Sequence, residues 1–144
     1  MNWDDINWEK SYDAFGAYGQ SKLCNVIFTR ELAKRLENTQ VTTYSLHPGV
    51  INTELTRYIG ELYGILFHIA SIFLIPISWY MFKTPEQGAQ TTIYCAVDEE
   101  IKNESGRYYS DCKEKKLLKH ATKDEDGERL WKMSEEIIQS KISK

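Results

Sequence analysis

The sequence contains few of the features that indicate a disulfide scaffold, a metal centre or a nucleic-acid surface. Its three cysteines, Cys24, Cys95 and Cys112, are far apart and odd in number, so we expect free thiols in a reducing compartment. The three histidines have no metal-ligand spacing among themselves or with the cysteines. Basic residues are interleaved with acidic ones and the net charge is only -3, which argues against a nucleic-acid partner.

The composition is not that of a disordered chain either. Its 144 residues fit one domain, and 42% hydrophobic with 27% charged residues is typical of a globular protein. Met1 is followed by polar, acidic sequence, so no signal peptide is expected there. Residues 1–16 show no sustained period and are predicted to form an irregular lead-in.

The most informative stretch is Ala17–Leu36, a run with helical period that holds Tyr18 and Lys22. Residues four apart lie one above the other on the same helix face. An ammonium at that place favours the phenolate, so we expect the pKa of Tyr18 to fall below its usual value of about 10. Such a tyrosine can give a proton to a carbonyl oxygen or take one from an alcohol.

A solvated helix face is the simpler alternative for this pair. With nine tyrosines, about one Tyr-x-x-x-Lys is expected by chance, and Tyr109 and Lys113 have the same spacing. Tyr109 lies in a short segment that is predicted to be a strand, and residues four apart in a strand are well separated. Only the first pair is therefore predicted to meet on one helix face.

A β-branched and aromatic segment, Val41–Leu46, follows and is predicted to be a strand. It stops at His47, before a Pro-Gly pair. In open α/β sheets the ligand crevice lies just outside the C-terminal ends of the strands, so Pro48–Thr53 is a candidate ligand site. A plain strand-terminating turn is the alternative.

The segment Leu62–Phe82 carries no formal charge over 21 residues, which meets the length criterion for a membrane-spanning helix. Pro76 and His68 argue against a span, whereas Trp79 and Tyr80 suit a membrane interface. Three interpretations stay open: a buried hairpin or lid over an apolar substrate, an interfacial segment, and a true span.

Two helices and a strand are predicted in the remainder. Thr84–Gln87 predicts a helix start with a capping box and proline in the first turn. Arg107–Ser110 is a short strand, and Asp124–Asp126 leads into a last amphipathic helix. The apolar faces expected to be buried are Ala89, Ile93, Ala96 and Val97 on the first helix, and Leu130, Trp131, Ile137 and Ile138 on the last.

In combination, Tyr18-x-x-x-Lys22, the strand and Pro48-Gly49-Val50-x-x-Thr53 resemble the C-terminal half of the short-chain dehydrogenase/reductases. Further segments resemble the retinol dehydrogenase branch and follow the family's order: AYGQSKLCNVIFTRELAKRL, VTTYSLHPGVINTEL, KTPEQGAQTTIYCAVD, SGRYYSDC and RLWKMSEEII. The resemblance implies an α/β fold, the C-terminal half of a Rossmann-type doubly wound parallel sheet, incomplete in this chain.

The resemblance also implies an organisation of residues 1–144 as part of one domain. The catalytic helix, strand and Pro-Gly turn would occupy 16–61, an apolar substrate lid or membrane-contact segment 62–83, and a helix, strand and helix 84–144. The resemblance implies that Tyr18 is the general acid/base on the substrate oxygen and that Lys22 binds the nicotinamide ribose. Pro48, Gly49 and Val50 would line the nicotinamide. The Val50 backbone and the Thr53 side chain would bind its carboxamide or a nearby phosphate.

The implied function is an NADP(H)-dependent oxidoreductase that interconverts retinol and retinal, or similar lipophilic alcohols and carbonyls. NADPH/NADP is the expected cofactor, with NAD left open, and no metal is implied. The expected partners are a retinoid-like substrate, a membrane contacted through Leu62–Phe82, and a second copy in a homodimer. The endoplasmic reticulum membrane is the expected location, with mitochondrial and cytosolic locations left open.

The chain departs from the family pattern upstream of Tyr18. Gly16 is the only glycine there, so the family's G-x-x-x-G-x-G phosphate loop is missing, and Ser11 does not take the role of the catalytic serine. We expect a C-terminal fragment with weak cofactor affinity, no turnover by itself and an open strand edge. The alternative is a non-catalytic, truncated, membrane-associated product that pairs with a full-length relative. A generic α/β fragment with a coincidental Tyr–Lys pair is a third interpretation.

Overall fold

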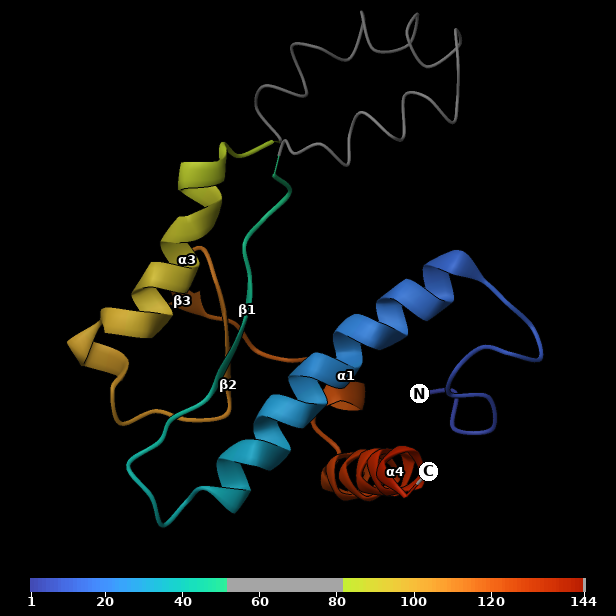
Figure 1. Cartoon of the computed structure of the whole chain (residues 1–144). Coiled ribbons are helices and arrows are strands. Elements are labelled where there is room, and N and C mark those ends of the chain that lie inside the picture. The colour runs from blue at the N-terminus through green and yellow to red at the C-terminus, as the bar shows by residue number, and fades with distance from the viewer. Residues whose placement is uncertain (52–81, 144) are drawn as a thin grey trace, which may run out of the picture. The chain divides into compact units, whose positions relative to one another are not determined.

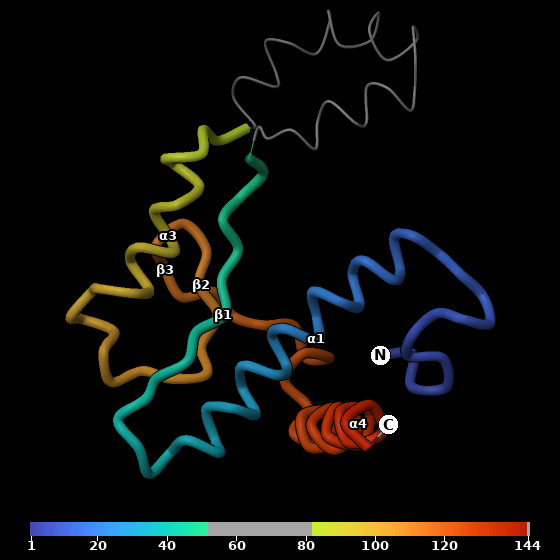
Figure 2. Tube along the Cα trace, viewed as in Figure 1, coloured from blue at the N-terminus to red at the C-terminus, as the bar shows by residue number. Residues whose placement is uncertain are grey.

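A computed structural model describes residues 1–51 and 82–143. The chain divides into two compact units (Figure 1). The first comprises Met1–Ser45, Lys102–Tyr108 and Lys115–Lys144, and the second comprises Leu46–Ile101 and Tyr109–Glu114. Each unit is therefore assembled from separate stretches of sequence. Figure 2 colours the trace by residue number, so these stretches can be followed along the chain.

The first unit is built on α1, Ala14–Arg35. The helix begins at Ala14 rather than at Ala17, because Asp13 supplies the N-cap: its carboxylate accepts the Gly16 N–H at 2.8 Å. Arg35 is its last residue, and the Leu36 N–H bonds to the Leu32 carbonyl. The periodic run thus predicted the helix, and the cap residue decided where it starts.

The lead-in before α1 is irregular, as predicted, but it is held against the helix. The Gln20 side chain accepts the Asn2 N–H at 2.7 Å and donates to the Ile6 carbonyl at 3.0 Å. Trp8 lies against Gly16 so closely that a Cβ there would sit 2.5 Å from the indole ring. Gly16 is therefore a packing position for the lead-in.

Helix α4, Asp124–Ile142, packs against α1. Ile27 of α1 and Leu130 of α4 are buried, with 1% and 9% of their surface exposed. Glu31 is also buried, and a Cβ added to Gly127 of α4 would lie 3.1 Å from its carboxylate. A glycine at position 127 thus lets the two helix backbones approach over a buried carboxylate.

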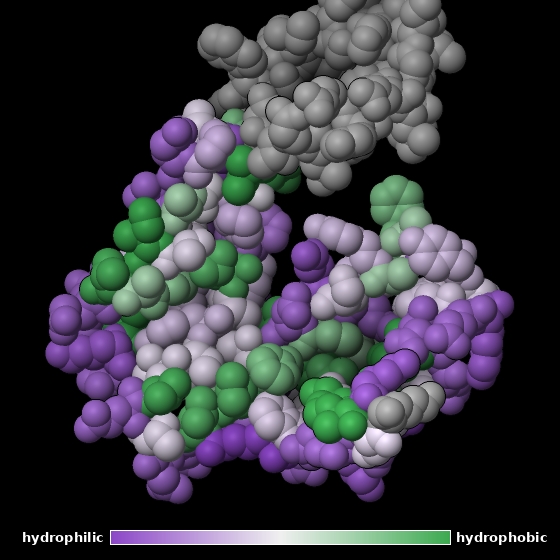
Figure 3. Space-filling model, in the orientation of Figure 1, coloured by the Kyte–Doolittle hydropathy of each residue, from purple (hydrophilic) through white to green (hydrophobic). Residues whose placement is uncertain are grey.

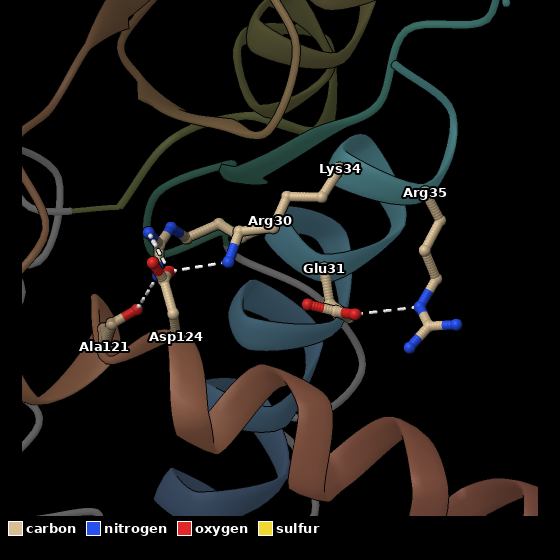
Figure 4. Close-up of polar contacts among 6 residues, drawn as sticks. All are labelled: Arg30, Glu31, Lys34, Arg35, Ala121 and Asp124. Atoms are coloured by element: carbon tan, nitrogen blue, oxygen red, sulfur yellow. Dashed lines mark hydrogen bonds and ion pairs between the residues drawn. The ribbon is translucent and has the colours of Figure 1, made fainter. Parts of the chain in front are cut away.

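Charged side chains join the C-terminal part of α1 to the start of α4 (Figure 4). Lys34 Nζ lies 2.7 Å and an Arg30 guanidinium nitrogen 3.4 Å from the Asp124 carboxylate, at the start of α4. Arg30 also donates to the Ala121 carbonyl at 3.1 Å. Hydrogen bonding from Lys34, then its charge, lowers the pKa of Asp124 below its usual value. Asp124 also suits the positive N-terminal end of α4.

Trp131 joins the same two helices through its ring. The Phe28 ring stacks on it with centroids 5.4 Å apart, and the Arg35 guanidinium lies 4.3 Å from its centroid. Arg35 Nε in turn donates to the Glu31 carboxylate at 2.8 Å. The predicted apolar face of α4 is confirmed at Leu130 and is wrong at two positions: Ile137 and Ile138 are 45% and 54% exposed.

Three short strands form one mixed sheet in the order β1 (Tyr44–His47), β2 (Arg107–Ser110), β3 (Lys113–Glu114). β2 and β3 are antiparallel, with Tyr109 opposite Glu114, so the expected parallel arrangement describes only part of the sheet. The α/β class and strand 107–110 are confirmed. β1 begins at Tyr44 rather than Val41, since the Thr43 N–H bonds to the Ser105 hydroxyl instead of a strand partner.

The second unit contains α3, Pro85–Val97. Its predicted capping box is confirmed: the Thr84 hydroxyl accepts the Gln87 N–H at 3.3 Å, and the Gln87 side chain accepts the Thr84 N–H at 3.0 Å. The buried face was predicted wrongly. Gly88 and Thr91 are buried, while the expected apolar residues lie exposed at the surface over α3 (Figure 3): Ala89, Ile93, Ala96 and Val97.

Small and hydroxyl-bearing residues face inward on α3 because the Ile51 side chain and the Cys112 backbone approach it closely. Gly88 lies against Ile51, and the Thr91 hydroxyl accepts the Cys112 N–H at 3.4 Å. The Tyr94 ring packs on Tyr109, with centroids 5.9 Å apart. These contacts decide that Gly88 and Thr91, and not the apolar residues of α3, face the interior of the unit.

Candidate active site

Tyr18 and Lys22 lie near the start of α1, in the first unit. Lys22 Nζ is 5.3 Å from the centroid of the Tyr18 ring, within the range of a cation–π contact. The predicted juxtaposition on one helix face is therefore confirmed. The decoy pair is not on a helix: Tyr109 belongs to β2, is 1% exposed and has its ring against Tyr94. The two residues do not have the expected separation along one strand, because a hairpin turn places Tyr109 opposite Glu114, next to Lys113.

The face of α1 that carries Tyr18 is open within the described part of the chain. Tyr18 is 65% exposed and Phe15, one turn earlier, is 86% exposed. No heavy atom lies within 4 Å of a Cβ built on Gly19, and no described residue bonds to the Tyr18 phenol. The Ser21 hydroxyl is directed elsewhere, to the Tyr18 carbonyl at 2.8 Å. The phenol and the ammonium are thus accessible to a small molecule.

The Pro48–Gly49–Val50 turn follows β1 and belongs to the second unit. The Gly49 N–H donates to His47 Nδ1 at 2.9 Å, and Gly49 has φ of +92°, which favours glycine. A Cβ at this position would also lie 2.8 Å from Cδ of Lys83. Glycine is therefore required at position 49 by both its backbone angle and its neighbour.

Val50 is the residue of the turn whose backbone groups can be followed in detail. Val50 is 53% exposed, and its carbonyl accepts the Lys83 N–H at 2.8 Å. Among residues 1–51 and 82–143, no hydrogen bond is formed to the Val50 N–H. Within the described residues this N–H can therefore donate to a ligand oxygen, while Lys83 occupies the side of Gly49 where a Cβ would lie.

Lys83 and Asp111 are the residues of this region that sequence reasoning missed. Lys83 Nζ lies 2.5 Å from an Asp111 carboxylate oxygen, and Lys83 pairs with Ile51 in a parallel bridge. In the sequence, Lys83 only bounds the apolar segment, and Asp111 is one of many acids. Nothing local in either stretch signals the contact between them.

The structure thus describes the predicted site residues in two groups. Tyr18 and Lys22 belong to the first unit, and Pro48, Gly49 and Val50 to the second. Thr53 lies outside the described residues, as does Leu62–Phe82 apart from its last residue. Within residues 1–51 and 82–143, no helix has the length and apolar character needed to cross a bilayer.

The remaining candidate chemistry is sparse. The described residues contain no group of three or more His, Cys, Asp or Glu that could hold a metal ion. Cys24, Cys95 and Cys112 are free, and burial raises the pKa of the first two. A hollow of about 800 Å³ lies at the far end of α1 and is lined by three cations, Arg30, Lys34 and Lys102, of which Asp124 engages the first two. We assign it no part in proton transfer.

No protein-family model matches the chain. Among curated proteins, it is 46% identical to human retinol dehydrogenase 14 over 138 residues, which are 96% of this chain and 40% of that protein. It is 44% identical to human retinol dehydrogenase 12 over 93% of this chain and 40% of that one. For human retinol dehydrogenase 13 the identity is 42%, with 96% and 41% covered. The chain spans about two fifths of the length of these relatives.

Proposed function

The chain belongs to the short-chain dehydrogenase/reductase family, with retinol dehydrogenases as its relatives at 38–46% identity, and on that premise we propose that it carries the proton-transfer residues of a retinoid oxidoreductase. The proposed reaction interconverts retinol and retinal, or similar lipophilic alcohols and carbonyls. The observation that carries the proposal is the Lys22 ammonium over the exposed Tyr18 ring.

Tyr18 is proposed as the general acid/base. In the direction of reduction its phenol gives a proton to the substrate's carbonyl oxygen, and in the direction of oxidation the phenolate takes that proton from the alcohol. Lys22 stabilises the phenolate through its charge and binds the ribose hydroxyls of a nicotinamide cofactor. The cofactor, when bound, supplies or accepts the hydride.

The Pro48–Val50 turn is proposed to hold the nicotinamide. This proposal rests on the Val50 N–H, which forms no hydrogen bond within residues 1–51 and 82–143 and can donate to a carboxamide oxygen. Thr53 is proposed to bind the carboxamide or a nearby phosphate. NADPH is the proposed cofactor, and NAD remains the competing choice.

Three finer proposals concern the setting of the reaction. Leu62–Phe82 is proposed to cover an apolar substrate or to contact a membrane, because it is long and uncharged. The endoplasmic reticulum membrane is the proposed location. A homodimer is the proposed assembly.

Turnover of retinal with NADPH by the 144-residue chain tests the proposal, with Tyr18→Phe as the decisive variant. The substitution removes only the hydroxyl, so we expect turnover to fall by roughly 100- to 10,000-fold. Tyr12→Phe is the matched control, because Tyr12 is also exposed (77%) and lies just before α1. Measurable turnover that is equal in wild type and Tyr18→Phe would sink the proposal.

A second candidate rests on the long, uncharged segment Leu62–Phe82, which suits contact with a membrane. In it the chain is a non-catalytic, membrane-associated product that associates with a full-length relative. Absence of turnover and of NADPH binding in the wild-type chain, together with co-purification with full-length retinol dehydrogenase 14, would favour this candidate. Turnover that depends on Tyr18 would exclude it.

A further inference from the structure

The β2–β3 hairpin has a connection that its sequence does not favour. Asp111 and Cys112 form a two-residue loop, and their φ angles are +56° and +54°. Hairpin loops with two positive φ angles prefer Asn-Gly or Asp-Gly, because a Cβ is unfavourable there. Cysteine at the second position therefore needs support from elsewhere in the fold.

Two side chains of the same unit supply that support. The buried Thr91 hydroxyl, on a residue only 1% exposed, accepts the Cys112 N–H at 3.4 Å. Lys83 Nζ forms an ion pair with the Asp111 carboxylate at 2.5 Å, and this carboxylate also accepts from the Ser110 hydroxyl at 3.3 Å. The loop is thus held on one side by α3 and on the other by Lys83.

Both the backbone and the side chain of Lys83 contact the turn at residues 49–51. Its N–H donates to the Val50 carbonyl at 2.8 Å, and it pairs with Ile51 in a parallel bridge. Its Cδ, Cε and Nζ lie 2.8, 2.9 and 3.1 Å from the position that a Cβ on Gly49 would occupy. The side chain therefore runs across Gly49 before it reaches Asp111.

We propose that Lys83 is a positioning residue for the nicotinamide turn: it clamps Gly49 and Val50 to the β2–β3 hairpin through its ion pair with Asp111. This inference rests on the proposed function, because the turn matters to catalysis only if it holds the cofactor. Lys83 acts through the turn and is not assigned a contact with substrate or cofactor. Its charge is neutralised by Asp111, so its role is mechanical.

The test compares Lys83→Met, Asp111→Asn and the double variant in the 144-residue chain. Methionine keeps most of the aliphatic length of Lys83 over Gly49 and removes the charge. Lys113→Met is the matched control, since it removes an exposed lysine on β3 in the same hairpin and changes the net charge equally. Two quantities are measured: amide hydrogen exchange at positions 49 and 83, and the Kd for NADPH from tryptophan fluorescence.

Lys83 and Asp111 are partly exposed, with 31% and 58% of their side-chain surface accessible, so the expected effects are moderate. We expect exchange to accelerate and the NADPH Kd to rise by about two- to five-fold in each single variant. The double variant should be no worse than either single one, because each removes the same contact. Lys83→Arg should restore both quantities, and Lys113→Met should leave both unchanged.

The two readouts separate failure of the clamp from failure of the proposed function. If wild type does not bind NADPH, the proposed function fails, and exchange at positions 49 and 83 alone decides whether the clamp exists. If exchange in Lys83→Met equals that in Lys113→Met, the clamp is refuted. If exchange accelerates while a measurable NADPH Kd stays at the wild-type value, the clamp exists but does not position the cofactor, and the inference is overturned.

Discussion

Gly88→Ala is the substitution that most directly tests how α3 sits in its unit. A Cβ at position 88 would lie 2.3 Å from Ile51 Cδ1 and 2.8 Å from Cγ1. Ile51 would have to withdraw by about 1.1 Å, the difference between 2.3 Å and the 3.4 Å at which ordinary contact begins. Overpacking of this kind costs about 1–3 kcal/mol, and alanine regains about 1 kcal/mol of helix propensity over glycine.

We therefore expect Gly88→Ala to lower the free energy of unfolding by up to about 2 kcal/mol, measured by urea denaturation. Ile51→Ala removes the clashing atoms, so in that background Gly88→Ala should become neutral or stabilise by up to about 1 kcal/mol. This change of sign is the specific expectation, and it reports contact between the two positions.

Gly19→Ala is the matched control, because Gly19 is also helical but has no described heavy atom within 4 Å of its Cβ position. It should stabilise the chain by about 0.5–1 kcal/mol. The reasoning is refuted if Gly88→Ala costs the same with and without Ile51→Ala, or if Gly19→Ala destabilises by as much as Gly88→Ala.

Two further predictions concern the packing of α1 on α4. Gly127→Ala places a Cβ 3.1 Å from the Glu31 carboxylate, a milder clash than at Gly88. We therefore expect it to lower the free energy of unfolding by at most about 1 kcal/mol, measured by urea denaturation, and a larger loss than for Gly88→Ala would contradict this ordering. The lowered pKa of Asp124 means that its carboxylate is favoured in the folded state, so its stabilisation is present above the usual Asp pKa and is lost as pH falls below that value. Asp124→Asn should therefore flatten the dependence of the free energy of unfolding on pH between about 5 and 2, and an unchanged slope would refute the contribution of Lys34.

Features specified by neighbouring residues were predicted well from the sequence. The Thr84–Gln87 capping box involves residues three apart, and the Tyr18–Lys22 contact needs only a helix. Strand 107–110 was likewise predicted from its residue types. In each case the interaction that defines the feature lies within one turn or one strand of the chain.

Features decided by distant residues were missed. The inner face of α3 is set by Ile51 and Cys112, so Gly88 and Thr91 are buried in place of its apolar stripe. The loop at Asp111 carries no glycine to signal its positive φ angles. Lys83 contacts Asp111 only because the fold joins two segments far apart in sequence, and no periodicity reports such a contact.

The division of the first unit into separate stretches has a consequence for biosynthesis. Ile27 and Glu31 on α1 become buried against α4, but α4 begins only at Asp124, long after α1 ends at Arg35. At a translation rate of roughly 5–20 residues per second, α1 leaves the ribosome about 5–20 s before α4 is complete. During that interval the nascent helix exposes its inner face, which makes it a target for chaperones that bind apolar segments at the ribosomal exit. The unit can close only after α4 has left the ribosome.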